Sequence, residues 1–182
     1  TNVVNGGSNP CPNPVTGSVT VTVKPLPTAT IAGDATVCRG GAAQVITFTG
    51  AGGTEPYTFT YKINGGANLT VNSSGGPNGT VNAPTTVAGT YVYTLVSVKD
   101  AGAGGCTNTS VTGTATVVVN PLPNASISGT TEVCLNAPQP DLTFTGSVGT
   151  APFTFTYTIN GGAVQTVSSA GNTATVSVPT NA

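Results

Sequence analysis

The side chains that could do chemistry in this 182-residue chain are few: four cysteines, five carboxylates and four basic residues, with no histidine. The cysteines lie far apart, at Cys11, Cys38, Cys106 and Cys134. A zinc site needs closely spaced ligands, and a thiol nucleophile needs a nearby base, so we expect neither. Disulfide formation is the chemistry that remains, and it is typical of an oxidising, extracellular location.

The carboxylates are isolated along the chain, at Asp34, Glu55, Asp100, Glu132 and Asp141. Catalysis by paired carboxylates needs two that the fold brings together, and calcium needs six to eight oxygens with several carboxylates among them. The spacing gives no sign of either. We therefore expect no catalytic residue, no cofactor and no metal site, and we predict that the protein is not an enzyme.

The composition favours an all-β protein. Only 5% of the residues are charged, while Thr and Val, which favour strands, and Gly, Asn and Pro, which favour turns, are abundant. The four basic residues are scattered singly, which argues against nucleic-acid binding. No apolar run approaches the 18 or more residues of a membrane span, so we expect none in this segment.

A duplication organises the chain. Several motifs recur 96 positions later, namely Pro25-Leu26-Pro27, Val37-Cys38, Thr47 to Gly50, Pro56 to Tyr61 and Ile63 to Ala67. A third, partial copy lies at the N-terminus, where residues 1–24 correspond to the end of the repeat. We therefore predict three parts: residues 1–24 as the C-terminal strands of a preceding repeat, 25–120 as a complete repeat, and 121–182 as a repeat that lacks its last two strands.

Seven short strands are predicted in the complete repeat, at 28–32, 45–49, 57–63, 68–72, 79–83, 90–98 and 111–119. This number and spacing favour tandem immunoglobulin-like antiparallel β-sandwiches of about 95 residues each. The third strand alternates, with Tyr57, Phe59, Tyr61 and Ile63 on one face. We expect these aromatic residues to form the core rather than a ligand platform, facing Tyr91, Tyr93 and Leu95 across it, with Ile46 and Phe48 from the opposite sheet.

The cysteines take positions in this scheme. Cys38 precedes the second predicted strand and Cys106 lies between the sixth and the seventh, so we predict a disulfide between them at one end of the sandwich. Cys11 corresponds to Cys106, and Cys134 corresponds to Cys38. Each should therefore pair outside its own part of the chain, which makes Cys11 and Cys134 candidates for an inter-repeat or inter-subunit disulfide.

Two arrangements explain the incomplete parts. The chain is a window of a longer tandem array, or identical subunits assemble head to tail, with residues 1–24 of one copy completing 121–182 of the next. A heterologous contact of the second kind produces a filament. Between them, the two parts lack only a counterpart of Ala88 to Leu95.

The segment 25–33, the Val-Cys that follows it and the block 56–66 resemble the tandem immunoglobulin-like or PKD-like repeats of very large Bacteroidota surface proteins, including gliding-motility adhesins. The resemblance implies export, display at the cell surface and a role as stalk, fibre or adhesin. It brings no catalytic residues. We expect a structural or adhesive unit whose partners are neighbouring repeats or identical subunits. A module that binds surface glycans is the alternative from another class.

Overall fold

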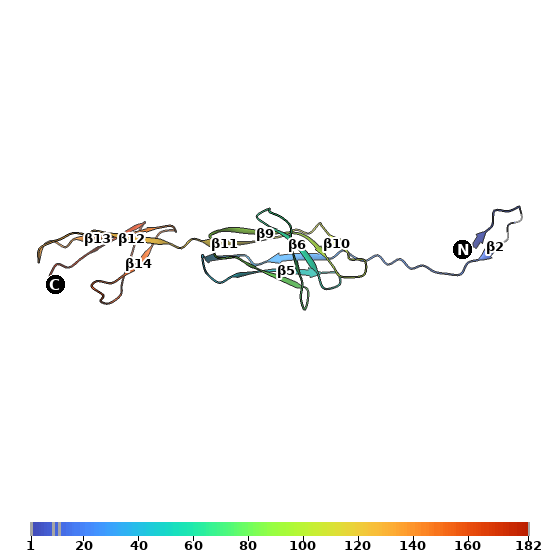
Figure 1. Ribbon diagram of the computed structural model, residues 1–182, viewed down its shortest axis with the longest axis horizontal. Helices are drawn as coiled ribbons and strands as arrows, with labels where there is room; N and C mark the ends of the chain where they lie inside the picture. The colour runs from blue at the N-terminus through green and yellow to red at the C-terminus, as the bar shows by residue number, and fades with distance from the viewer. Residues whose placement is uncertain (1, 9, 11, 182) are drawn as a thin grey trace.

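The computed structural model describes residues 2–8, 10 and 12–181, and the secondary structure of these residues is entirely β. Three parts follow one another along the molecule (Figure 1). A small hairpin and an extended segment come first, then a closed β-sandwich, then a pair of sheets that pack through only a small core. The predicted all-β class is confirmed.

The closed sandwich has two sheets. The three-stranded sheet has the order β3-β5-β8, with β3 at Thr28–Ala32, β5 at Gln44–Ala51 and β8 at Asn78–Ala83. The second sheet has the order β4-β11-β9-β6-β7, formed by Ala35–Cys38, Thr114–Asn120, Gly89–Lys99, Thr58–Ile63 and Leu69–Asn72. A short strand, β10 (Thr107–Asn108), pairs with the end of β9. Each of the seven predicted strands has an observed counterpart.

Strand β4 was not predicted from the sequence, and it changes the topology. The chain leaves the first sheet at Gly33, whose positive φ of 132° lets it turn, and a Cβ there would lie 2.5 Å from the Val45 carbonyl oxygen. It then joins the second sheet, where β4 pairs with β11 in parallel. The Asp34 carboxylate stabilises the crossing by accepting a hydrogen bond from the Thr116 N–H (2.6 Å).

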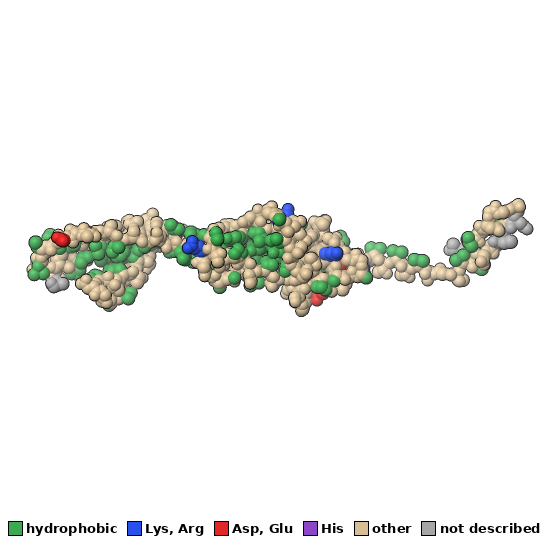
Figure 2. All heavy atoms as spheres, viewed as in Figure 1, with side chains coloured by type: hydrophobic (Ala, Val, Ile, Leu, Met, Phe, Trp, Pro, Cys, Tyr) green, Lys and Arg blue, Asp and Glu red, His purple; other side chains and the backbone are tan. Residues whose placement is uncertain are grey.

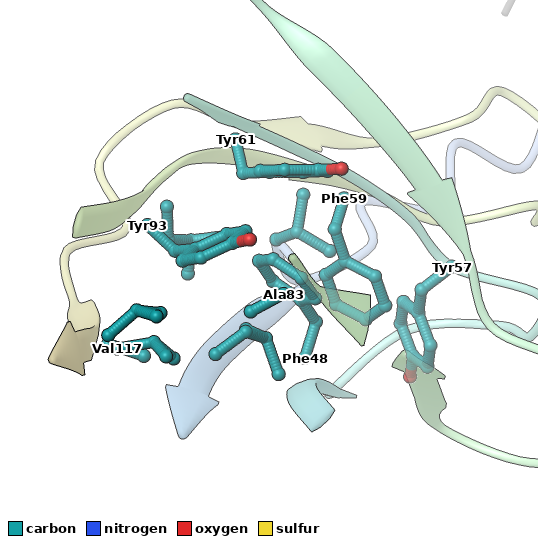
Figure 3. Close-up of a cluster of buried hydrophobic side chains, with 12 residues drawn as sticks. Phe48, Tyr57, Phe59, Tyr61, Ala83, Tyr93 and Val117 are labelled. Atoms are coloured by element: carbon teal, nitrogen blue, oxygen red, sulfur yellow. The ribbon is translucent and has the colours of Figure 1, made fainter. Parts of the chain in front are cut away.

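The core lies between the two sheets (Figure 3). Phe48 from β5 meets the Tyr61 ring of β6 at 5.0 Å between centroids, and Tyr61 meets the Tyr93 ring of β9 at 6.1 Å. The predicted inward face of β6 is confirmed. One expectation was wrong: Tyr93 and Leu95 do not face β6 across the core, because β9 and β6 are hydrogen-bonded neighbours in the same sheet.

The C-terminal unit repeats the pairing of the sandwich in five strands. One sheet has the order β12-β13-β16, formed by Asn124–Ser128, Asp141–Ser147 and Thr173–Ser177. The other contains β14 (Thr154–Tyr157) and β15 (Gln165–Ser168). The register is copied as well: Thr28 pairs with Ala51 in the first unit, and their counterparts Asn124 and Ser147 pair in the second.

The N-terminal hairpin also copies a piece of the sandwich. Strands β1 (Asn2–Val4) and β2 (Pro12–Pro14) pair with Val4 opposite Pro12, as Lys99 lies opposite Thr107 in the β9–β10 pair. Residues 15–27 then run as an extended segment to the sandwich (Figure 1).

A substitution at Gly50 tests how closely the core is packed. A Cβ at this residue would lie 2.5 Å from the Tyr57 ring, and Gly146 has the same relation to Phe153. Gly50→Ala should therefore lower the free energy of unfolding of the sandwich by about 1–3 kcal/mol, because the ring has to move from its packed position. Denaturant unfolding measures the change. Gly171→Ala, where a Cβ meets no atom within 4 Å, is the control and should have little effect.

The buried tyrosines predict a pH dependence. Burial raises the pKa of Tyr61 and of Tyr93 above the ordinary value of 10.0, and the charges of Tyr61 and Tyr91 raise that of Tyr93 further. The unfolded chain therefore releases these protons first, so the stabilisation is complete below about pH 10 and is lost above it. The melting temperature should fall above pH 10. The double variant Tyr61→Phe/Tyr93→Phe should show a clearly smaller fall, and an equal fall would contradict the assignment.

Candidate functional site

Three of the carboxylates make hydrogen bonds that stabilise this fold. Asp100 is buried and accepts hydrogen bonds from the N–H groups of Cys106 (2.7 Å) and Thr54 (3.2 Å), which holds two loops together at one end of the sandwich. Asp34 binds the Thr116 N–H, as described above, and Asp141 accepts a hydrogen bond from the Ser177 hydroxyl. Among the described residues, no group of three or more His, Cys, Asp or Glu side chains could hold a metal ion.

The aromatic residues of the sandwich point inward, as expected. Tyr57, Phe59, Tyr61 and Tyr93 are all buried. Even the Tyr57 hydroxyl is used internally, since it accepts a hydrogen bond from the Gly53 N–H at 3.1 Å. This set of rings therefore forms a core and presents no stacking surface to a sugar.

The predicted disulfide between Cys38 and Cys106 is wrong. Both side chains are free thiols. Cys38 pairs with Asn120, and the residue before Asn120 pairs with Gly89, the first residue of β9. Cys106 directly precedes Thr107, which pairs with Lys99, the last residue of β9. Strand β9 runs from Gly89 to Lys99, and at about 3.3 Å per residue its ends are roughly 33 Å apart. The cysteines therefore lie at opposite ends of the sandwich, far beyond the reach of a disulfide, whose Cα atoms are usually about 4.4–6.8 Å apart.

The error has a physical cause. Without β4, Cys38 seemed to lie in a loop that was free to approach Cys106. The pairing of β4 with β11 instead fixes Cys38 at the end where the chain leaves the sandwich. Of the other two cysteines, Cys134 is an exposed free thiol, and Cys11 lies outside the described residues.

The C-terminal unit exposes apolar surface that the closed sandwich buries. Phe144 and Phe155 still contact each other, with ring centroids 5.5 Å apart. Around them Ile127 is 59% exposed, and Leu142 and Tyr157 are only half-buried. These residues line hollows between the two sheets, where hydrophobic side chains are visible from one side (Figure 2). In the closed sandwich, this side is covered by β9 and β11.

The extended segment carries the complementary surface. Val19, Val21 and Val23 are 92%, 83% and 89% exposed. Their counterparts in β11 are Ala115, Val117 and Val119, which are 1%, 0% and 2% exposed in the closed sandwich. Thr20 and Thr22 alternate with the valines, so the segment has the two-residue period of a half-buried strand without a sheet to cover.

The open unit and the extended segment 15–24 are therefore the candidate site, because their apolar surfaces match the two halves of the closed sandwich. Sequence reasoning found both halves through the repeat register. It did not find the central requirement for closure: β11 reaches the rest of its sheet through β9, which contributes the buried Tyr93 and Leu95. Residues 1–24 contain no counterpart of that part of β9.

A scan against protein-family models matches none, and a search of curated proteins finds no match. The described residues contain no helix that is long and apolar enough to cross a membrane.

Matched substitutions test the difference between the two equivalent strands. Val117→Asp buries a charge in the core and should lower the free energy of unfolding of the sandwich by about 4 kcal/mol or more. Val21→Asp makes the same change in the exposed segment and should leave thermal unfolding unchanged. Scanning calorimetry of the two variants measures both effects. Destabilisation of the isolated chain by Val21→Asp would show that the segment already packs against a sheet.

Proposed function

We propose that this chain is a structural unit of an extracellular fibre or stalk, without catalysis, in which immunoglobulin-like sandwiches of about 95 residues follow one another end to end. The observation that carries the proposal is the pair of matching surfaces: an extended segment with three exposed valines in one part of the chain and an open sandwich in another. Each is a part of a sandwich in the same repeat register. The resemblance to Bacteroidota surface repeats supports an adhesive setting at the cell surface.

The path of the chain through the closed sandwich supports an end-to-end arrangement. The chain enters at Pro27, whose carbonyl accepts a hydrogen bond from the Asn108 side chain (2.8 Å) beside the far end of β9. It leaves at Asn120, whose carbonyl accepts from the Arg39 N–H (2.8 Å) at the other end. Entry and exit are therefore separated by the length of the sandwich, and the hairpin, the sandwich and the C-terminal unit follow one another along the molecule (Figure 1).

The parallel pairing of β4 with β11 suits a unit that carries a mechanical load. Tension on the two ends of the sandwich draws β4 toward the entry and β11 toward the exit. Because these strands are parallel neighbours, their hydrogen bonds lie across the direction of pull. The strands must then slide past each other with several bonds breaking together, rather than separate one bond at a time.

Assembly of identical subunits head to tail is the second candidate, and the same exposed valines favour it. Residues 1–24 of one copy would cover the open unit of another by strand addition. A sandwich made in this way has no counterpart of Ala88 to Leu95 in the middle of its larger sheet. The fibre of consecutive sandwiches, each with a complete β9, is therefore the better supported proposal.

Stretching a single molecule from its two termini tests the mechanical role. The closed sandwich should unfold in one step with a gain in contour length of roughly 300 Å, set by about 3.5 Å per residue over 28–120. Thr36→Pro interrupts β4 and should lower the unfolding force, because β4 lies in the path of the load. A step below roughly 100 Å would instead reveal an internal Cys38–Cys106 bridge.

Thr70→Pro provides the matched control. Thr36 and Thr70 are both exposed, and they lie on β4 and β7, the two edge strands of the same sheet. Of these two edge strands, only β4 pairs with β11. Thr70→Pro should therefore leave the unfolding force closer to that of the parent protein, and an equal loss of force in the two variants would contradict the load-bearing role of β4.

A further inference from the structure

We infer that the cysteines join neighbouring sandwiches: Cys38 of one sandwich forms a disulfide with the counterpart of Cys106 in the sandwich that follows it. The inference rests on the proposed end-to-end arrangement. It replaces a bridge within one sandwich, which the structure excludes, with a bridge across each junction.

Cys38 marks the exit end of the sandwich. It is the last residue of β4 and lies opposite Asn120, the last residue of β11. Its side chain is exposed and carries a free thiol. Pro121, Leu122 and Pro123 follow Asn120 directly and lead into the next unit. Cys38 therefore lies at the junction with the following sandwich.

Cys106 marks the entry end. The loop 101–105 precedes it and extends back over the incoming chain, where the Lys24 ammonium donates a hydrogen bond to the Ala103 carbonyl (3.3 Å). Asp100 holds this loop closed through the Cys106 N–H, and Asn108 fastens the next residues to the Pro27 carbonyl. Cys106 therefore lies at the entry end, directly after a loop that the Lys24 side chain reaches.

The repeat register superimposes the two ends. Lys24 corresponds to Asn120, since each directly precedes a Pro-Leu-Pro segment. A loop like 101–105 in the following sandwich would thus lie against Asn120, the residue that has Cys38 as its neighbour in the adjoining strand. Adjacent strands are about 4.8 Å apart. The repeat register therefore brings the exit end that carries Cys38 and the entry end that carries Cys106 together at the same junction.

The same ends carry the other cysteines. Cys134 corresponds to Cys38, and Cys11 corresponds to Cys106, although Cys11 lies outside the described residues. Cys38, Cys106 and Cys134 thus map to end positions of the repeat, and one bridge per junction would use them along an array. The Pro-Leu-Pro connection and the disulfide together would hold each junction at two points.

The reaction is a thiol–disulfide exchange. Two thiols lose two protons and two electrons and form one S–S bond, while a small-molecule or protein disulfide accepts the electrons and is released as two thiols. Cys38 is exposed and Cys106 is half-exposed, so both are accessible to such an oxidant.

A peptide of residues Ala88–Asn120 tests the inference on the full chain. It contains β9, β10 and β11 and has one cysteine, Cys106, so it should close the open unit 121–182 and place that cysteine at the junction. Binding is measured with reduced thiols, as protection of β14 amides from hydrogen exchange. The mixture, with Cys11→Ser in the protein, is then oxidised with glutathione disulfide. Cleavage after Arg39 and after Glu132 separates Cys38, Cys106 and Cys134 into different fragments.

We expect the peptide to be linked to Cys38 at least tenfold more than to Cys134, and Cys38→Ser to abolish the adduct without loss of binding. Linkage mainly to Cys134 would mean a bridge within one sandwich and would overturn the inference. Binding without any adduct would also overturn it, but would leave the proposed fibre standing.

A fused chain covers the case in which the peptide alone does not fold. Residues 88–120 placed directly after Ala182 continue the repeat register and raise the local concentration of the closing strands to the millimolar range. The same linkage to Cys38 is expected there. If the open unit gains no protection in the fused chain either, the proposed function fails together with the inference. Val117→Asp in the appended segment is the control that should prevent closure.

Discussion

The contact between the inner faces of two sheets is the constraint on which this molecule depends. A sandwich of this chain has few large side chains, and rings such as Phe48, Tyr61 and Tyr93 must all meet in one layer to exclude water. Charges contribute little, since only 5% of the residues carry one. The fold is therefore stabilised mainly by covering both inner faces, and a unit without β9 and β11 leaves one of them open.

That constraint leaves two equivalent segments of the repeat, 15–24 and 111–120, in different states in one chain. In β11 the alternating valines lie under the aromatic layer, and in the segment around Val21 the same pattern is exposed to water. The two segments share the same alternation of apolar and polar positions, but only β11 has a sheet to pair with. The inward face of a strand is thus encoded locally, while its burial depends on a neighbour.

The duplication made much of this predictable from the sequence. Residue alternation along Tyr57 to Ile63 identified the buried face, and the 96-residue register identified which parts of the sandwich were incomplete. Strand β4 was not predictable in the same way. It has four residues, it follows a glycine crossing, and its parallel pairing with β11 joins segments more than 80 residues apart. Local patterns carry no information about such a pairing.

The position of Cys38 depends on that one unpredicted pairing. The role that we infer for the cysteines depends on it as well. When Cys38 is treated as a loop residue, a bridge to Cys106 appears to reinforce the sandwich from within. With β4 in place, the two thiols lie at opposite ends of β9 and each faces a junction. The core of each sandwich already holds its own strands together, whereas the Pro-Leu-Pro connection between sandwiches has no core of its own. In the proposed fibre, a covalent link would add most at that junction, where continuity depends on the fewest contacts.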